Sequence, residues 1–482
     1  MRRYWPLALL IVVILAIGLW AASRNRNAPE TSAHIEPPPV EAPQSKPVEP
    51  KPEIPHVPET AAATPHPTHE TETEAEAQSI DPPLVVVIWI SVDGLRGDYI
   101  DTADTPFLER FLLEGAYSRE LIPVFPSLTF PSHVSQCTGA PVRDHGIIAN
   151  ALYDIENDRR WSYPNDNSAI LCEPIWNTAS RQGRRTAVFD WPVSQKQTGP
   201  DAAAYFTQSY NTSLSDQQRL EQLWDAWARD RDPQPLQLLM GYFPGVDSTG
   251  HKYGPNAPET KHAVKEADDL LAESFHLCEQ HIRQNYGDNV VWYFIVSTDH
   301  GMDDIHTLVS LRGLLGEAHG DDVRSVTSGS VGNIFLDFVS DPEARDALRE
   351  LMLQQLNRHD FVHAYAREEL PADWAYDCPG RTGDIVVSID PGYFFSEAPG
   401  PTPGPPIRPV DPDRGPLGMH GYPLADCPQM YGFFGIWRSG EPLGGVDLGP
   451  VDSLRLHSTV ANLLDIAPAP TALNDPLPSL GP

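Results

Sequence analysis

The sequence predicts an α/β domain whose mostly parallel central sheet lies between layers of helices. Three continuous apolar runs support this prediction: residues 84–92, 236–243 and 290–297. A run without polar alternation is typical of a strand that is buried on both faces. Helical stretches lie among these runs, at residues 106–114, 214–229 and 260–284. Strands that alternate with helices in this way favour a parallel sheet covered on both faces.

The last part of the chain adds two expected elements. Residues 451–464 are expected to form a final helix that packs on the sheet. Residues 399–416 are rich in Pro and Gly and are expected to form an exposed loop. The whole of 81–482 is long enough for one large α/β domain, which we expect to be the catalytic domain.

The first 26 residues are expected to anchor the chain in a membrane. Two arginines precede an uncharged run that ends at Ser23, and about 18 such residues form a helix that spans a bilayer. A cleaved signal peptide is the alternative, because small residues close the run. Its length and the interfacial position of Trp20 favour a retained single-pass anchor. Whether the segment is an anchor or a signal peptide, the rest of the chain is expected on the extracytoplasmic side of the cell membrane, periplasmic or extracellular.

Residues 27–80 are expected to be a disordered linker. They are dense in Pro, Glu, Ala and Thr and nearly free of aromatic side chains. Such a segment buries too little apolar surface to offset the entropy of ordering it, and its prolines favour extended conformations. We therefore expect a spacer between the membrane and the catalytic domain.

Net charge and cysteine content narrow the function classes. The chain has 34 Lys and Arg against 66 Asp and Glu, a formal charge of −32. This excess disfavours nucleic-acid polymers and anionic membrane surfaces as partners, although a metal site could still bind a small anionic substrate. The five cysteines show no CxxC spacing and could form one or two disulfides after export. The pattern predicts no particular oligomeric state.

Each of the three apolar runs is followed by an aspartate. Asp93 comes directly after the first, Asp247 lies four residues after the second, and Asp299 lies two residues after the third. Ligands of open α/β sheets bind beyond the carboxyl ends of the strands, so these side chains are expected to converge. His251 and His300 follow two of them at short spacing. Carboxylate and imidazole are the usual ligands of Zn²⁺ where thiolates are absent.

Thr129 is the candidate nucleophile. Two prolines bracket it in the stretch FPSLTFPSH, which leads into a helix expected from His133. A hydroxyl beside a helix N-terminus is often only a cap, but the same position suits a phosphate, because free N–H groups point at it. A hydroxyl needs a base or a metal to become a nucleophile near neutral pH, and the nearby acids could hold that metal.

With these residues, the sequence resembles the nucleotide pyrophosphatases/phosphodiesterases of the alkaline phosphatase superfamily. The resemblance extends from about residue 84 to residue 470 and rests on several motifs in the family's order. They are the strand followed by Asp93-Gly94, FPSLTFPSH, Asp247 with His251, Asp299-His300-Gly301-Met302, Gly418-Met419-His420-Gly421-Tyr422 and Cys172-Glu173-Pro174-Ile175-Trp176. The resemblance implies an alkaline-phosphatase-like fold and a metal-dependent phosphoric ester hydrolase.

The resemblance also implies how the site works. Asp93, Asp299 and His300 would hold one zinc ion together with the Thr129 oxygen. A second zinc ion would be held by Asp247, His251 and His420, although Mn²⁺ or Fe could take such ligands in some organisms. Hydrolysis would pass through a phospho-threonine intermediate. Four further histidines are expected to be structural or exposed: His133, His145, His262 and His306.

The expected substrate is a small phosphate ester, a nucleotide or a related diester. Phe130, Trp191 and Tyr205 are expected to shape the pocket by stacking, although core positions are equally compatible with these aromatic side chains. Ser132 stands where the family is expected to carry an asparagine that contacts a phosphate oxygen. Because serine has a shorter side chain with one donor, the sequence does not decide which class of phosphate ester is preferred.

Several alternatives remain at this stage. A phosphomonoesterase or a phospholipid-type phosphodiesterase could use the same site, and a surface binding module without activity could use the same scaffold. No arginine lies near Thr129 in the sequence, which favours a singly charged diester over a dianionic monoester. A sulfatase is disfavoured, because the stretch lacks the Cys or Ser, Pro and Arg of the formylglycine motif.

Overall fold

The computed structural model describes residues 82–320, 322–396, 405–473 and 475–478. The description below concerns the compact unit formed by residues 79–482. The expected anchor at 1–26 and the expected linker at 27–80 lie outside the described residues. Among the helices that are described, none combines the length and the apolar character that crossing a membrane requires.

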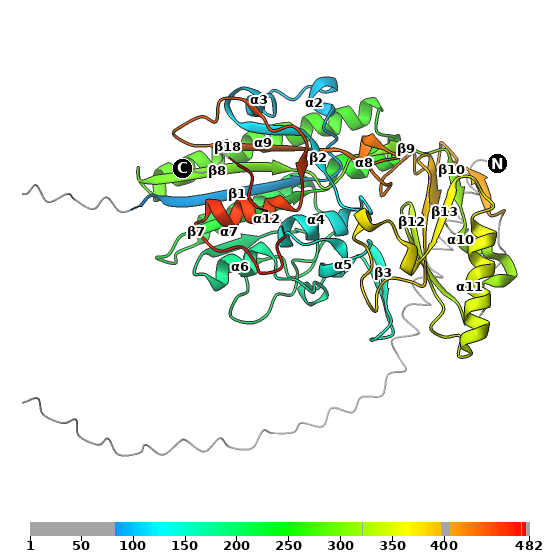
Figure 1. The fold of residues 1–482 in the computed structure, drawn as a ribbon. Helices are drawn as coiled ribbons and strands as arrows, with labels where there is room; N and C mark the ends of the chain where they lie inside the picture. The colour runs from blue at the N-terminus through cyan, green and yellow to red at the C-terminus, as the bar shows by residue number, and fades with distance from the viewer. Residues whose placement is uncertain (1–81, 321, 397–404, 474, 479–482) are drawn as a thin grey trace, which may run out of the picture. The chain divides into compact units, whose positions relative to one another are not determined.

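A central sheet with mostly parallel strands organises the domain (Figure 1), as predicted. The three apolar runs are strands β1 (Leu84–Val92), β7 (Leu236–Phe243) and β8 (Val290–Ser297), with the predicted bounds. β1 lies between β7 and β8 and is parallel to both. The remaining strands are β5 (Arg185–Val188), β6 (Tyr205–Phe206), β18 (Gly432–Arg438), β2 (Ala116–Ile122), β19 (Val446–Asp447) and β20 (Val451–Asp452). Only β18 runs antiparallel to its neighbours, β8 and β2.

The two faces of β1 pack into separate apolar clusters. Val87 and Trp89 lie in one cluster with α4 (Thr129–Thr138), α6 (Ile175–Arg181) and α12 (Arg455–Leu463). The alternate residues Val86, Ile88 and Ile90 lie in the other with α3 (Glu109–Glu114), α7 (Asp216–Arg229) and α9 (Pro258–Asn285). Because successive strand side chains point to opposite faces, both faces are buried and the run is apolar throughout.

Three expected elements differ from the structure at their ends. The helix expected at 106–114 begins only at Glu109, because the Asp268 carboxylate accepts the N–H groups of Phe107 and Leu108 at 3.0 and 2.8 Å and holds them in a turn. The helix expected at 451–464 begins later than expected. Residues 451–452 form β20, which pairs with β2, and α12 follows from Arg455. The expected loop at 399–416 contains a short strand, β16 (Ile407–Pro409), while residues 397–404 are outside the described part.

A second, antiparallel sheet lies beyond the carboxyl ends of the central strands and was not predicted. It has the order β11 (Arg324–Ser328), β12 (Val331–Phe335), β14 (Ile385–Ile389), β13 (Val362–Ala366), and it packs on α11 (Pro342–Leu356). The hairpin β3 (Ala151–Asp154) and β4 (Arg159–Ser162) contacts its edge strand β11. Figure 1 shows this sheet and α11 together on one side of the domain.

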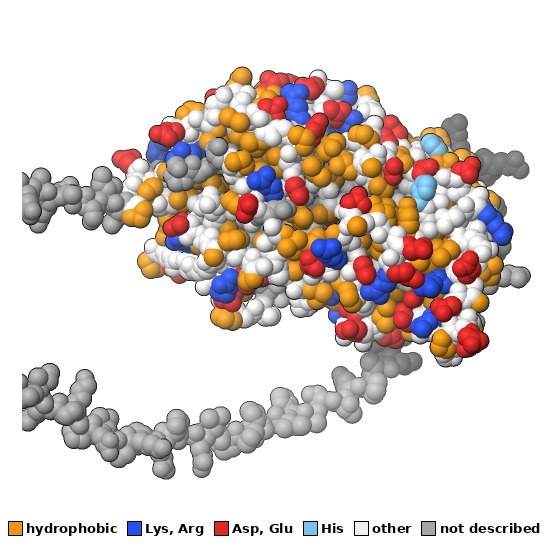
Figure 2. All heavy atoms as spheres, viewed as in Figure 1, with side chains coloured by type: hydrophobic (Ala, Val, Ile, Leu, Met, Phe, Trp, Pro, Cys, Tyr) orange, Lys and Arg blue, Asp and Glu red, His pale blue; other side chains and the backbone are white. Residues whose placement is uncertain are grey.

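Short strands and free thiols complete the description. β9 (Asp303–Asp304) pairs with β17 (Gly418–Met419), which brings two distant motifs side by side. All five cysteines lie in the described ranges, and each has a free thiol in this structure. On the face shown in Figure 2, acidic and basic side chains are interspersed, so the excess of acid does not form one patch there.

Candidate active site

The site forms where β1, β7 and β8 end. Asp93 follows β1, and its backbone N–H donates to the carbonyl of Phe243 at the end of β7. Asp247 lies in the first turn of α8 (Gly245–Tyr253), and its N–H donates to the carbonyl of Asp93 at 3.1 Å. A Cβ at Gly94 would come within 3.0 Å of the Asp247 Cα, and the φ of Gly94 is +71°. Glycine therefore allows the two acidic segments to approach this closely.

One group of ligand atoms surrounds the Nε2 atom of His300. This atom lies 3.4 Å from Asp93 Oδ1, 3.0 Å from Asp299 Oδ2 and 3.3 Å from Thr129 Oγ1. Asp93, Asp299 and His300 are all buried, and their ligand atoms lie close enough together to hold one ion. The structure thus brings together the residues expected at the first metal position.

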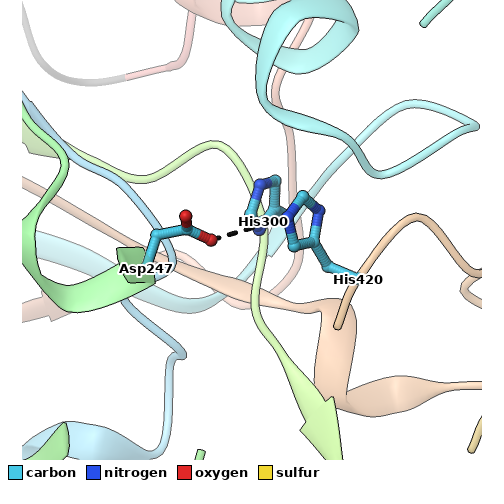
Figure 3. Close-up of side chains that lie close together, drawn as sticks. All are labelled: Asp247, His300 and His420. Atoms are coloured by element: carbon cyan, nitrogen blue, oxygen red, sulfur yellow. Dashed lines mark ion pairs between the residues drawn. The ribbon is translucent and has the colours of Figure 1, made fainter. Parts of the chain in front are cut away.

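A second group adjoins the first. His251 Nε2 lies 3.3 Å from Asp247 Oδ1 and 3.3 Å from His420 Nε2, and His420 Nε2 lies 3.5 Å from Asp247 Oδ1. Figure 3 shows the Asp247 carboxylate directed at the imidazoles of His300 and His420, whose rings stack with centroids 3.5 Å apart. The two groups therefore form one continuous centre with ligands from four separated segments.

Backbone carbonyl groups orient each histidine so that its Nε2 atom is available to bind a cation. The Nδ1–H groups of His300, His251 and His420 each face a backbone carbonyl, those of Gly301, Gly418 and Ser127, at 2.8, 2.8 and 3.0 Å. An Nδ1 that donates leaves Nε2 with its lone pair, and it is Nε2 that points into the centre in all three residues.

The spacing of these atoms fits the ligands of a bound metal ion. Ligand atoms about 2.0–2.1 Å from a tetrahedral Zn²⁺ lie about 3.3 Å from one another, and the distances above range from 3.0 to 3.5 Å. Three buried oxygens have no hydrogen-bond donor in the described residues, and they are Asp93 Oδ1, Asp247 Oδ1 and Asp299 Oδ2. These are the same oxygens that face the imidazoles. A buried carboxylate oxygen without a donor is costly, and a cation would satisfy it.

The pKa values reflect the burial of these groups and their proximity to one another. Burial raises the pKa of Asp93 well above its ordinary value, and the charges of Asp299 and Asp247 raise it further. Burial also raises the pKa of Asp247. For Asp299, burial acts upward as well, but His300 and His133 outweigh it and hold that pKa well below the ordinary value. Burial, together with His300 and His251, lowers the pKa of His420 well below its ordinary value.

Two residues that we did not predict support the ligands. His133 was expected to be merely structural, yet its Nδ1 lies 2.8 Å from the Thr129 carbonyl and 3.3 Å from Asp299 Oδ2. Its Nε2 lies 2.9 Å from Ser91 Oγ, so the ring is fixed at both ends. The Tyr242 hydroxyl donates to Asp93 Oδ2 and so leaves Oδ1 for an ion. The other three histidines, His145, His262 and His306, take no part in the centre.

A cavity of about 450 Å³ opens on the centre beside Thr129. α4 begins at Thr129, four residues earlier than expected, which places the N-terminal end of this buried helix at the cavity. Its other walls include Phe130, Asn150, Tyr163 and Tyr210. Asn150 Oδ1 accepts the N–H of Phe130 at 2.9 Å, which leaves the Asn150 NH₂ group for a ligand.

Three of the four residues expected at the substrate are not in this cavity. Ser132 is fully buried in α4, away from the cavity lining. Trp191 is also fully buried, with its ring centroid 4.9 Å from that of Trp89 under the sheet. Tyr205 donates to Asp230 at the opposite end of the strands. Phe130 alone lines the cavity, and the asparagine amide at the site is that of Asn150.

The fold and the site define a metal-dependent hydrolase of phosphate esters. The sequence model of the family described as type I phosphodiesterase/nucleotide pyrophosphatase matches residues 87–423. The chain therefore belongs to this family.

Sequence relatives agree with this membership, and a solved structure shares the fold. The rat ectonucleotide pyrophosphatase/phosphodiesterase family member 7 is 27% identical over 404 residues, covering 80% of this chain and 84% of that protein. A bis(5′-adenosyl)-triphosphatase of Xenopus laevis is 29% identical over 319 residues, covering 64% and 66%. The fold is similar to that of an inactive variant of murine ectonucleotide pyrophosphatase/phosphodiesterase 5 in complex with AMP. In that comparison the TM-score is 0.67, the identity is 23%, and 81% of this chain and 96% of the other are covered.

The assignment of Trp191 to the core and of Tyr163 to the cavity rim can be tested by comparing Trp191→Ala with Tyr163→Ala. Trp191 fills the core, so its truncation should lower the free energy of unfolding by about 3–5 kcal/mol. Tyr163 is 61% exposed at the cavity rim, so its truncation should change stability by no more than about 0.5 kcal/mol. Urea unfolding of both variants measures this. Equal losses would contradict the assignment of Trp191 to the core.

Proposed function

We propose that the protein is an extracytoplasmic two-zinc phosphodiesterase with nucleotide pyrophosphatase activity that uses Thr129 as its nucleophile. The observation that carries the proposal is the pair of adjoining ligand groups with the Thr129 hydroxyl in hydrogen-bond range of one of them. Zinc is proposed because each group combines carboxylate with imidazole and contains no thiolate. When bound, the two cations would lower the pKa of the Thr129 hydroxyl and balance the charge of the reacting phosphate.

The chain's own residues orient the reaction. The N-terminal end of α4 would face the phosphate with the positive end of its dipole, and Asn150 would donate to a non-bridging oxygen. His133 would hold the carbonyl of Thr129 and thereby its side-chain position. The Thr129 oxygen would attack phosphorus to give a phospho-threonine, which water would hydrolyse in a second displacement.

The cavity favours diesters with a planar group. No lysine or arginine is among its lining residues, which suits a singly charged diester better than a dianionic monoester. Phe130, Tyr163 and Tyr210 offer faces on which a nucleobase could stack. The AMP bound to the murine structural relative, and the names of the sequence relatives, support a nucleotide as substrate.

The activity is testable on the soluble unit, residues 79–482, loaded with zinc. It should cleave bis-p-nitrophenyl phosphate in preference to p-nitrophenyl phosphate. Thr129→Ala should abolish turnover, and Asn150→Ala should lower kcat/KM by about 10²–10³. Ser132→Ala is the matched control and should change kcat/KM by less than about threefold, since Ser132 lies outside the cavity. A preference for the monoester would contradict the diester assignment.

Measuring the metal content of the protein distinguishes a metal-binding catalytic centre from a cluster of acidic residues that binds no ion. The purified unit should hold two zinc ions per chain, one for each ligand group. Asp247→Asn should leave about one, because only one group loses a charged ligand. Ser248→Ala, which changes the adjacent cavity-lining residue, should leave both. Elemental analysis by mass spectrometry gives the count, and retention of both ions by Asp247→Asn would contradict the assignment.

We further propose that residues 1–26 anchor the chain in the cell membrane and that residues 27–80 tether the catalytic unit outside the cytoplasm. The apolar run and the Pro-rich composition support this proposal. The full-length chain should pellet with membranes and be released by detergent but not by salt, and deletion of residues 1–26 should keep it in the cytoplasm. A mature soluble chain that begins near Ser23 would instead indicate a cleaved signal peptide.

A further inference from the structure

One wall of the cavity beside Thr129 is a loop that regular structure does not hold in place. Residues 207–215 connect β6 to α7 without forming a helix or a strand, and they bring Tyr210 and Thr212 to the cavity. Between residues 208 and 214 of this described loop there is one backbone hydrogen bond, from the N–H of Leu214 to the carbonyl of Asn211 at 3.4 Å. The position of the wall therefore depends on side-chain contacts.

The side chain of Tyr210 stands between two hollows. It lines the cavity of about 450 Å³ beside Thr129 and also a hollow of about 760 Å³ that adjoins α7 and α9. Four lining residues are shared by the two hollows: Tyr210, Thr212, Pro244 and Ser248. Tyr210 has the largest side chain of the four, so the place of its ring decides how far the hollows are separated.

The second hollow is unfavourable for an anionic substrate. We call it the acidic hollow, because four carboxyl groups line it: Asp216, Glu266, Asp269 and Glu273. Like charges repel strongly at short range and weakly across a barrier that keeps them apart. A phosphate ester in the cavity is therefore best bound while the Tyr210 ring lies between it and these acids.

Arg219 contacts both the ring and the backbone of this wall. It lies near the start of α7 and is buried. Its guanidinium carbon lies 4.4 Å from the centroid of the Tyr210 ring, and its Nη2 donates to the carbonyl of Asn211 at 2.8 Å. A buried cation over an aromatic ring is attracted to that ring. Arg219 is not among the described residues that line the cavity, so it acts on a substrate only through Tyr210.

Asp190 fixes the guanidinium from the side of the sheet. Arg219 Nη1 donates to Asp190 Oδ2 at 2.5 Å, and each of the two side chains is only 2% exposed. Asp190 directly follows β5, and its N–H donates to the Thr207 hydroxyl at the start of the loop at 3.0 Å. The ion pair thus connects β5, the loop and α7.

The pair is poorly explained by stability alone. Removing two charges from water costs about as much as their attraction returns, so a buried ion pair adds little net stability. The Nε–H group of Arg219 is also buried without a hydrogen-bond partner in the described residues, which is a further cost. What the pair does provide is one defined conformation of the wall.

We propose that Arg219, held by Asp190, is a positioning residue that keeps Tyr210 in place as the wall between the cavity and the acidic hollow. The inference rests on the proposed phosphodiesterase function and deepens it, because the pair would make the enzyme selective for diesters that carry a planar ring. Without the pair, such a substrate loses its stacking surface, whereas a diester without a ring has no such contact to lose.

A second pair of the same chemistry serves as the matched control. Arg185, the first residue of β5, donates to both oxygens of Asp230 at 2.7 and 3.0 Å. Asp230 directly follows α7 and also accepts the hydroxyl of Tyr205 at 3.0 Å. This pair joins the same strand to the same helix at their other ends, and none of its members is among the described residues that line the cavity.

The experiment compares two diesters with the same leaving group, using the full-length, zinc-loaded chain in detergent. The p-nitrophenyl ester of thymidine 5′-monophosphate carries a base, and methyl p-nitrophenyl phosphate carries a methyl group in its place. Arg219→Gln should lower the ratio of kcat/KM for the first ester to kcat/KM for the second about tenfold, mainly through KM. Arg219→Lys keeps the buried charge but loses the planar fork, so it should fold and give an intermediate ratio. Arg185→Gln should leave the ratio within about twofold.

A double-mutant cycle separates positioning from general damage. Tyr210→Ala should lower the ratio about as much as Arg219→Gln, because both remove the same stacking surface. The double variant should show no further decrease, since Arg219 has no route to the substrate except Tyr210. Two decreases that multiply in the double variant would mean that Arg219 acts elsewhere and would overturn the proposal.

Binding provides a readout that is independent of turnover. In the Thr129→Ala background, calorimetry should show that Arg219→Gln weakens binding of AMP about tenfold and leaves binding of inorganic phosphate within about twofold. Equal weakening of both ligands, or of neither, would overturn the proposal, as would a ratio lowered equally by Arg185→Gln. If the unmodified chain cleaves neither diester, the proposed function itself fails. If it cleaves both and Arg219→Gln and Arg219→Lys leave the ratio unchanged, only the role of Arg219 fails.

Discussion

The site depends on a concentration of buried carboxyl groups that the other protein groups satisfy only in part. Asp93, Asp247 and Asp299 meet at the ends of adjacent strands, and each has one oxygen without a donor in the described structure. Burying even one such charge is unfavourable, and bringing three together adds repulsion. The sheet imposes this arrangement because its apolar strands fix where each segment ends. Cations turn the repulsion into attraction, so metal binding should stabilise the folded domain as well as serve the chemistry.

The second ligand group depends on contacts between distant parts of the chain. His420 reaches the centre only because β17 pairs with β9, where Met419 is opposite Asp303. The same strand supplies the carbonyl of Gly418 that fixes the His251 ring. One short antiparallel pairing thus positions one ligand and orients another. Substitutions that weaken this pairing would affect the second group before the first, whose residues follow directly from central strands.

The parts of the site that lie next to strong local patterns could be predicted from the sequence. The strands β1, β7 and β8 and the acids after them are examples, because an apolar run fixes both burial and direction. Asn150 could not be predicted, since a single asparagine before a short hairpin carries no periodic signal. Ser132 and Trp191 were misplaced for a packing reason. α4 is buried along nearly its whole length, so only its first turn reaches the cavity, and the loop after β5 turns at Asp190, with φ of 58°, to insert Trp191 into the core.

The two sides of the centre differ in a way that bears on how an acidic protein handles an anionic substrate. The cavity beside Thr129 offers aromatic faces and an amide but no lysine or arginine. A second hollow, which also reaches His251 and His420, is lined by Arg160 and by no carboxylate among the described residues. Net charge acts over long distances and is screened by salt, whereas these local groups act within a few ångströms. The excess of acid therefore need not repel a phosphate ester once it is bound, because groups within a few ångströms dominate the field there.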